Sequence, residues 1–202
     1  MRNIFFILIF ITGLTASAQN KEEVQTLFGK GLSHPGYFLS PTCQIGQIAG
    51  STAVVPGVGI GVVFNKHSYL SLVYKYIATE NTPVGQLDNS LYLDQRWGGV
   101  KFEYALLPEK TFHLSFPLEA GMSHVEYDKK DSFEGSSSGI PGDDASFAYL
   151  EPGVALELNI HKYVKLNFST TYKFVSNVTL GTVSQKDLMG LSFALSLKIG
   201  IF

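Results

Sequence analysis

The chain has 202 residues, a formal net charge of −2 and only 16% charged residues, whereas 45% are hydrophobic and 13% aromatic. The near-neutral balance argues against nucleic-acid binding, because a phosphate-binding face needs a strong excess of basic residues. Soluble surfaces usually carry about a quarter or more charged residues, so the low charge content predicts a surface that faces something other than water.

The first 18 residues have the pattern of a cleavable signal peptide. Arg2 supplies a positive charge, residues 4–14 form an apolar run, and residues 16–18 are the small residues of a cleavage site. The apolar run is shorter than the roughly 20 residues that a membrane-spanning helix needs. We therefore expect residues 19–31 to be a short periplasmic lead-in and residues 32–202 to form one domain.

From residue 32 onward, apolar residues recur with a period of two, which predicts strands rather than helices. About eight strands are expected, over residues 36–46, 51–65, 68–79, 90–107, 111–127, 146–160, 163–176 and 188–202. Tight connections at residues 65–67, 107–110 and 161–162 alternate with longer polar links at residues 80–89, 128–145 and 177–187. Turns at one rim and loops at the other are typical of an up-and-down barrel.

The two faces of each predicted strand differ in composition. In the last strand, large apolar residues at 191, 193, 195, 197, 199 and 201 oppose Ser192, Ala194, Ser196, Lys198 and Gly200. Small residues weaken a solvated strand, but they fit the crowded interior of a narrow barrel. This contrast predicts an all-β fold, a closed antiparallel up-and-down transmembrane β-barrel of about eight strands, with apolar rows toward lipid and polar rows toward the lumen.

The polar rows carry five lysines and four glutamates, which nearly balance. The predicted lumen charge network consists of Lys75, Lys101, Glu103, Glu119, Glu151, Glu157, Lys165, Lys173 and Lys198. On the lipid face each lysine would cost about 2–4 kcal/mol near the bilayer midplane, whereas paired charges are tolerated in a lumen. We expect inward-facing Lys/Glu pairs; the alternative is a mixed, solvated face.

Aromatic residues near the strand ends are candidates for interfacial girdles, in which amphipathic rings sit at the membrane surface. The candidates are Tyr37, Phe64, Tyr69, Tyr76, Tyr104, Phe112, Tyr127, Tyr149, Tyr163 and Phe202. Each of these rings is equally compatible with ordinary packing within the barrel.

The signal peptide, the repeated strands and the carboxy-terminal LSFALSLKIGIF resemble the small outer-membrane β-barrel proteins of Gram-negative bacteria, the OmpA/OmpX-like class. This resemblance implies a cell outer-membrane location, with both termini in the periplasm and outer-membrane lipid as the surroundings. In that class a terminal aromatic residue in phase with the lipid-facing row is a signal for the barrel assembly machinery. Phe202 is a terminal aromatic residue, but it follows Ile201 and is therefore out of phase with that row.

The predicted barrel favours a structural or surface-interaction role. An eight-stranded lumen is filled by side chains, which argues against a diffusion pore, so specificity is expected in the exposed loops. The longest, residues 128–146, contains Gly, Ser and five acidic residues, but their spacing matches no metal-binding motif. No catalytic residue, cofactor or metal is predicted, and the sequence identifies no extracellular ligand.

Two alternatives remain open from the sequence. His113 and Ser115 share a strand face and resemble the His-x-Ser arrangement of lipid A deacylases, which would make the chain a membrane-embedded lipid hydrolase. The predicted topology, however, places the pair beside the tight turn at residues 107–110, at the periplasmic rim, whereas the lipid A substrate lies in the outer leaflet. The second alternative, a soluble periplasmic ligand-binding barrel, requires the large apolar rows to point inward.

Overall fold

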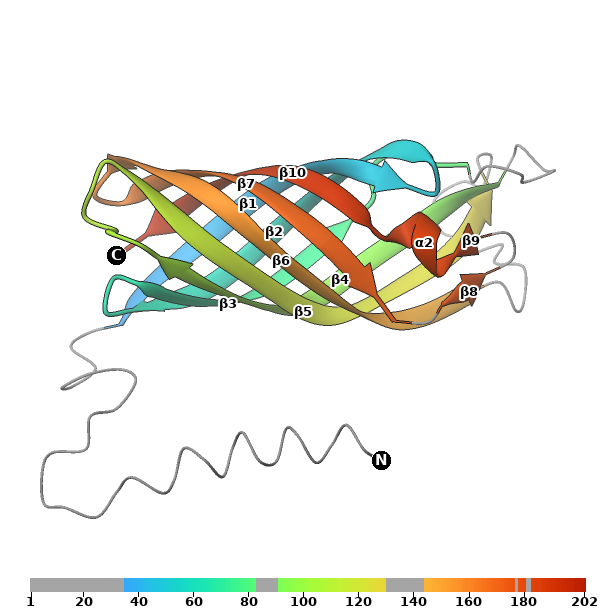
Figure 1. Cartoon of the computed structure of the whole chain (residues 1–202), viewed down its shortest axis with the longest axis horizontal. Coiled ribbons are helices and arrows are strands. Elements are labelled where there is room, and N and C mark those ends of the chain that lie inside the picture. Colours follow the sequence, from blue (N-terminus) through green and yellow to red (C-terminus); the bar gives the residue numbers. More distant parts are fainter. Residues whose placement is uncertain (1–34, 83–90, 130–143, 177, 181–182) are drawn as a thin grey trace, which may run out of the picture. The chain divides into compact units, whose positions relative to one another are not determined.

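The computed structural model describes residues 35–82, 91–129, 144–176, 178–180 and 183–202. Eight strands form one closed barrel (Figure 1). They are β1 (Gly36–Ile48), β2 (Ser51–Phe64), β3 (Ser68–Tyr76), β4 (Leu91–Ala105), β5 (Phe112–Lys129), β6 (Asp144–His161), β7 (Val164–Val175) and β10 (Gly190–Gly200). The predicted fold class is confirmed, and the predicted strand ends differ from these by no more than three residues.

Each barrel strand pairs antiparallel with its two neighbours, and β1 closes the sheet by pairing with both β2 and β10. The closing seam runs from Phe38 opposite Gly200 to Gly46 opposite Ser192. A closed sheet leaves no strand edge with unsatisfied backbone groups, which is the condition for crossing a bilayer with strands.

Tight turns gather at one end of the barrel, here called the turn end, together with residue 35 and Phe202 (Figure 1). At this end Asn65 and Lys66 both have positive φ, as a two-residue hairpin turn requires. The opposite end is called the loop end. The first link is also tight, with Ala49 at φ 52° and Gly50 at φ 80°, but it lies at the loop end. The predicted sorting of short and long connections therefore has one exception.

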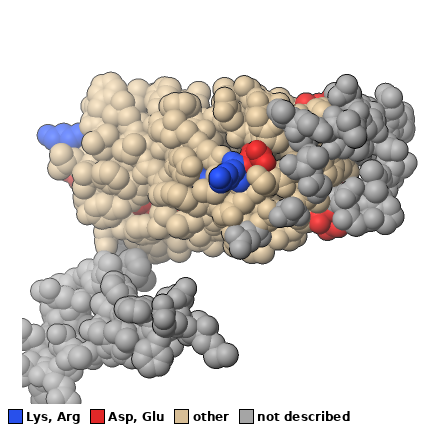
Figure 2. Space-filling model, turned by 45° about the vertical axis from the view of Figure 1, so that its right-hand side comes forward, with Lys and Arg blue, Asp and Glu red and all other residues tan. Residues whose placement is uncertain are grey.

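In each strand the apolar row faces outward and the polar row faces the lumen, as the composition predicts. Leu156, Phe168 and Leu195 lie on the outer wall with about half of their surface exposed, whereas Glu157 and Lys165 are buried inside. Of the outward-facing charged residues whose side chains are described in the barrel strands, all lie toward the loop end: Asp94, Arg96, Glu126 and Asp144. Figure 2 shows a broad band almost free of charged atoms on one face.

The aromatic candidates divide between the two walls. Tyr37, Tyr76, Tyr104, Phe112 and Tyr163 are exposed on the outside, as a girdle requires. For three others the girdle prediction is wrong, because Tyr69, Tyr127 and Tyr149 are buried in the lumen. Their odd residue numbers place them in the same inward rows as the lumen charges of β3, β5 and β6.

Apolar side chains form a cluster at each end of the lumen. At the turn end, Phe38, Val63, Tyr69 and Ala105 pack together, and the Phe202 ring lies 6.4 Å from the rings of Phe38 and Tyr69. Phe202 therefore packs with the turn-end cluster instead of joining an outer girdle. Its out-of-phase position in the sequence accounts for this, since it continues the inward row of β10.

At the loop end, a larger cluster combines lumen residues with the segment after β7. The sequence predicts a polar link here, but the segment contains β8 (Thr179–Leu180), β9 (Val183–Ser184) and the short helix α2 (Gln185–Leu188). Leu180, Val183 and Leu188 are buried in one cluster with the lumen residues Trp97 and Tyr127. We call this group the loop-end cluster.

Several sequence predictions fall outside the described residues. These are the signal peptide at residues 1–18, the lead-in at residues 19–31 and most of the loop at residues 128–146. In the described part of the chain, no helix is both long and apolar enough to cross a membrane.

Candidate functional site

The structure places the nine predicted lumen charges in the inward rows of the barrel wall. Eight of them are buried, and Lys101 is partly buried. Seven charges belong to two clusters, one nearer each end of the barrel. Lys101 and Lys173 belong to neither, because no carboxylate lies within ion-pair distance of them among the described residues.

The cluster nearer the loop end centres on Lys75 of β3. Its ammonium lies 2.7 Å from Oε1 of Glu119 and 3.2 Å from Oε2 of Glu151. Gln44 bridges this pair, since its amide nitrogen donates to Glu151 at 2.7 Å and its oxygen accepts from Lys75. Tyr149 donates its hydroxyl hydrogen to Glu119 at 2.8 Å. Both carboxylates therefore have several donors, which compensates for the water lost on burial.

The cluster nearer the turn end centres on Glu157 of β6. One carboxylate oxygen lies 2.5 Å from the ammonium of Lys198, and the other lies 3.2 Å from that of Lys165. Lys198 also reaches Glu103 at 2.7 Å, so it joins two carboxylates from β4 and β6. Asn167 donates its amide hydrogens to both glutamates.

Lys173 has an aromatic partner in place of a carboxylate. Its ammonium lies 4.2 Å from the ring centroid of Trp97, a distance at which a cation is attracted to the face of the ring. This contact connects the charged part of the lumen to the loop-end cluster, because Trp97 belongs to that cluster.

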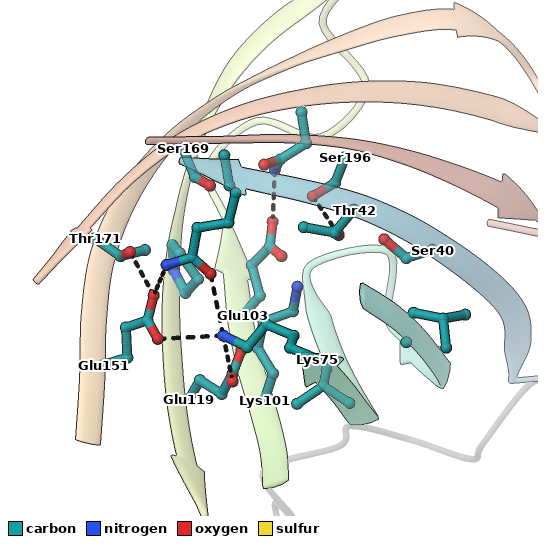
Figure 3. Close-up of a pocket in the computed structure, with 17 residues that line it drawn as sticks. Ser40, Thr42, Lys75, Lys101, Glu103, Glu119, Glu151, Ser169, Thr171 and Ser196 are labelled. Carbon is teal, nitrogen blue, oxygen red and sulfur yellow. Dashed lines mark hydrogen bonds and ion pairs between the residues drawn. The ribbon is translucent and has the colours of Figure 1, made fainter. Parts of the chain in front are cut away.

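A cavity of about 40 Å³ lies in the middle of the lumen (Figure 3). Residues from both clusters line it, including Glu103, Glu119 and Glu151. Lys101 also lines it, without a hydrogen bond or ion pair in Figure 3. The remaining polar lining is mostly hydroxyl groups: Ser40, Thr42, Ser169, Thr171 and Ser196.

The geometry of the two clusters suits a structural role. Breaking a buried ion pair by removing one partner destabilises a protein by about 3–5 kcal/mol, because the remaining charge is left uncompensated. Each cluster draws its members from strands on different parts of the wall, as in the contact between Lys75 of β3 and Glu151 of β6. Such contacts bind opposite sides of the barrel together across the lumen.

The proposed hydrolase pair lies in the lumen and lacks catalytic geometry. His113 and Ser115 are both buried, and the Ser115 hydroxyl forms no hydrogen bond among the described residues. The two ring nitrogens of His113 face the Lys110 carbonyl at 3.2 Å and the Glu157 carboxylate at 2.9 Å. Both ring nitrogens therefore face oxygen atoms other than the Ser115 hydroxyl, which forms no hydrogen bond with the ring among the described residues.

A separate ion pair lies at the turn end, outside the membrane-crossing strands. Lys66 donates to the Glu109 carboxylate at 2.8 Å, and both side chains are largely exposed. The hydrogen bond and the attraction between the charges raise the pKa of Lys66 and lower the pKa of Glu109. Water screens this exposed pair, so we expect it to add little to stability.

Sequence reasoning missed the neutral partners of the charges. Gln44, Tyr69, Tyr149, Asn167 and Thr171 all bond to charged lumen residues. They could have been predicted from the alternation of side chains along each strand. Each of them lies an even number of residues from an inward-facing charge or small residue of its own strand. Only the register between strands, however, shows which charge each one reaches.

No metal centre is present among the described residues, which contain no group of three or more His, Cys, Asp or Glu side chains placed to hold an ion. Cys43 is a free, exposed cysteine on the outer wall of β1. The candidate site is therefore the polar lumen itself, with its two charge clusters and the cavity between them.

Comparison with known proteins gives structural matches only. No family model and no curated protein matches the chain. Neisserial surface protein A superposes with a TM-score of 0.61 and 12% identity, over 84% of this chain and 99% of that protein. The N-terminal β-barrel domain of Pseudomonas aeruginosa OprF superposes with a TM-score of 0.52 and 11% identity, over 82% of this chain and 97% of that one. With its closed sheet of eight antiparallel strands, the chain has the fold of the small eight-stranded outer-membrane barrels.

Proposed function

We propose that this chain is an outer-membrane β-barrel with a filled lumen, which acts as a structural or surface-interaction protein through the loops at its loop end. Outer-membrane lipid surrounds the barrel, and the barrel assembly machinery inserts it. The observation that carries the proposal is the reversed arrangement of the wall, with bulky apolar side chains outside and ionic ones inside.

The outer wall supports the membrane location. Large apolar residues from every barrel strand are exposed on it, including Leu72, Phe102, Phe116, Phe168 and Leu195. Monomeric soluble proteins rarely expose a continuous apolar surface larger than a few hundred Å², so a belt around a whole barrel calls for lipid. A soluble ligand-binding barrel needs the opposite orientation, and the burial pattern argues against it.

The filled lumen argues for a role that does not depend on transport. Apolar clusters occupy both ends, and the two charge clusters occupy the middle. The central cavity of about 40 Å³ has room for only a few water molecules. A general diffusion pore would require a continuous water-filled path in place of these contacts.

The location is tested by membrane fractionation combined with migration on a detergent gel. We expect the protein in the outer-membrane fraction, resistant to extraction by salt or freeze-thaw. Unheated samples should migrate differently from boiled ones, because the closed barrel stays folded in the detergent. Release without detergent would overturn the membrane proposal.

The orientation, with the turn end in the periplasm, is tested by labelling cysteines on intact cells with a membrane-impermeant maleimide. Both variants are made in a Cys43→Ser background, so that only the new cysteine reacts. We expect Ser136→Cys, in the longest predicted loop, to be labelled and Lys162→Cys, in a tight turn, to be protected until the cells are lysed. The reverse pattern would contradict the proposed orientation.

The surface role is tested by deleting residues 131–142, which shortens the longest loop without entering β5 or β6. We expect the variant to fold and to show the same heat-modifiable migration, but to lose binding of cells to host or abiotic surfaces. A variant that binds as the wild type does would move the surface role to another loop or remove it. Incubation with outer-leaflet lipid should release no acyl chains; release would favour the hydrolase alternative.

A further inference from the structure

We propose that the rim of the turn end binds the headgroups of anionic phospholipids, through lysine side chains that extend beyond the lipid-facing wall. The inference rests on the membrane location proposed above, and it adds the headgroup charge that one end of the barrel selects. Insertion into a neutral bilayer tests the location, whereas headgroup preference tests the rim, so the two proposals can fail separately.

The two ends of the barrel differ in charge. Among the residues whose side chains are described, the turn end has three lysines against Glu109 and the carboxylate of the last residue, Phe202; the lysines are Lys66, Lys110 and Lys162. The loop end has five exposed or half-buried acidic residues against two basic ones: Glu80, Asp94, Glu126, Asp144 and Asp187 against Arg96 and Lys186. Basic side chains project from the turn end in Figure 2. An anionic surface is therefore attracted to the turn end and repelled by the loop end.

Two of the three turn-end lysines have no carboxylate partner. Lys66 is paired with Glu109 at 2.8 Å, but no carboxylate lies within ion-pair distance of Lys110 or Lys162 among the described residues. Both side chains are exposed, and the Lys162 ammonium lies 4.8 Å from the ring centroid of Tyr163. A lysine close to an anionic membrane surface strengthens attachment by about fivefold, which corresponds to about 1 kcal/mol.

Each of the three turns has an exposed aromatic side chain beside its lysine. These aromatic residues are Tyr104, Phe112 and Tyr163, with exposed fractions of 42%, 63% and 46%. Tyr104 contacts the turn between β2 and β3 through His67, whose ring is stacked on it with the centroids 5.8 Å apart. Tyrosine rings are enriched where hydrocarbon gives way to headgroups. The turns therefore place their lysines at the level of the headgroups.

A recess of about 430 Å³ lies at the same end of the barrel. Lys66 and Lys162 line it from two different turns, and no Asp or Glu side chain lines it among the described residues. The third lysine of the lining, Lys165, already bonds to Glu157, and the terminal carboxylate belongs to another lining residue. Ile160 is 55% exposed and also lines the recess, which joins it to the apolar wall. A headgroup phosphate in the recess meets ammonium groups while its acyl chains stay along the wall.

The turn that carries Lys110 is fixed by side chains of the neighbouring strands. The Lys110 carbonyl oxygen accepts a hydrogen bond from the Asn159 amide at 2.7 Å and lies 3.2 Å from a ring nitrogen of His113. Asn159 also donates to the Pro108 carbonyl at 2.8 Å. A backbone that is already ordered loses little freedom when a ligand binds, so the attraction between charges is not offset by ordering.

The direct experiment is native mass spectrometry of the wild-type barrel, released from micelles with equal amounts of phosphatidylglycerol and phosphatidylcholine. The two lipids carry the same acyl chains and differ in the net charge of the headgroup. We expect phosphatidylglycerol to be retained in clear excess, and the excess to shrink as the salt concentration rises. Equal retention of the two lipids would overturn the proposal, and this result needs no variant to fold.

Variants assign the preference to one end of the barrel. Lys110→Gln and Lys162→Gln should each lower the ratio of retained phosphatidylglycerol to phosphatidylcholine by about fivefold. Lys162→Arg should keep the ratio, because it keeps the charge. Lys186→Gln is the matched control, since it removes one exposed lysine at the loop end, and it should leave the ratio unchanged. An equal decrease in Lys186→Gln would contradict a site at the turn end.

Insertion into vesicles separates this inference from the membrane proposal. The wild type is added to vesicles of phosphatidylcholine alone and to vesicles that also contain phosphatidylglycerol, and heat-modifiable migration reports the folded barrel. A chain that enters both kinds of vesicle but retains the two lipids equally would contradict the headgroup site alone. A chain that enters neither would contradict both proposals. The same gel shows whether each variant is folded, so a lost preference is not mistaken for misfolding.

Discussion

Leu156 and Glu157 are adjacent in β6, yet they meet opposite surroundings. The Leu156 side chain is 45% exposed on the outer wall, and that of Glu157 is fully buried in the lumen. Leu156 lies opposite Leu114 and Phe168 of the two adjacent strands, whereas Glu157 joins Lys198, Lys165 and His113 from three other strands. In this barrel, therefore, the apolar wall matches the surroundings and the polar interior provides the specific tertiary contacts.

The strongest challenge to this comparison is Glu157→Ala. Removing the carboxylate leaves Lys198 and Lys165 with an uncompensated charge, so we expect a loss of about 3–5 kcal/mol in the free energy of unfolding. Urea unfolding in lipid vesicles measures it. Leu156→Ala is the matched control and should lose much less, because lipid takes the place of the missing side chain. Equal losses for the two variants would contradict the assigned role of the interior.

The reciprocal change places a charge on the outer wall. Leu156→Lys should destabilise the barrel in a bilayer by about 2–4 kcal/mol, since the ammonium has to enter the hydrocarbon region. The measurement is the same unfolding experiment, repeated for Phe112→Lys, close to the turn end, where the cost should be smaller. A lysine tolerated equally at both positions would mean that this wall does not face lipid.

A single hydroxyl group sharpens the comparison further. Tyr149→Phe removes the hydrogen bond to Glu119 but keeps the ring, and bonds to charged groups contribute about 1.5–3 kcal/mol. Tyr172→Phe makes the same chemical change on the outer wall, beside Phe174. We expect a clear loss for the first variant and a change within about 0.5 kcal/mol for the second. Similar values would show that the lumen bond contributes nothing specific.

The smallest effect is expected at α2, outside the barrel wall. Asp187 accepts hydrogen bonds from the side chain and backbone of Ser184 at 2.6 and 2.8 Å, and these bonds lower the pKa of Asp187. The contribution of a carboxylate with a lowered pKa is present above the ordinary aspartate pKa and is lost as the pH falls through the lowered value. Because Asp187 is exposed, we expect less than about 1 kcal/mol.

Trp97 reports this effect, since it is the single tryptophan and is buried in the loop-end cluster with Leu188. Acidification through the lowered pKa of Asp187 should shift the Trp97 emission slightly to the red as the segment around α2 loosens. Asp187→Asn should show part of this shift already at neutral pH and a smaller change on acidification. If Asp187→Asn shows the same emission shift on acidification as the wild type, the shift is caused by other carboxylates.

The alternation of side chains along each strand accounts for most of what the sequence predicts about the barrel wall. Alternate residues of a strand point to opposite sides, so Lys165 and Asn167 had to share a wall, with Leu166 on the other. The same rule applied to Tyr69 would have placed it in the lumen, beside the row of Lys75. Its residue type and its position near a strand end favour the girdle instead, which is why residue type alone gives the wrong wall for Tyr69.

The segment after β7 could not be predicted in the same way. Strands of two residues and a helix of four are too short to show a period, so Val183 and Leu188 carry no pattern that marks them as buried. They are buried because the mouth of the barrel presents Trp97 and Tyr127 to them. Only the closed barrel creates that surface.

Alternation and composition within single strands are enough to predict which side chains share a wall and which wall is apolar. Which charges meet, in contrast, depends on the folded barrel. Lys198 bonds to Glu103 across 95 residues of chain, whereas the Lys101 ammonium has no ion-pair partner among the described residues. Such pairings depend on the register of strands around a closed sheet, and no local stretch of sequence contains that information.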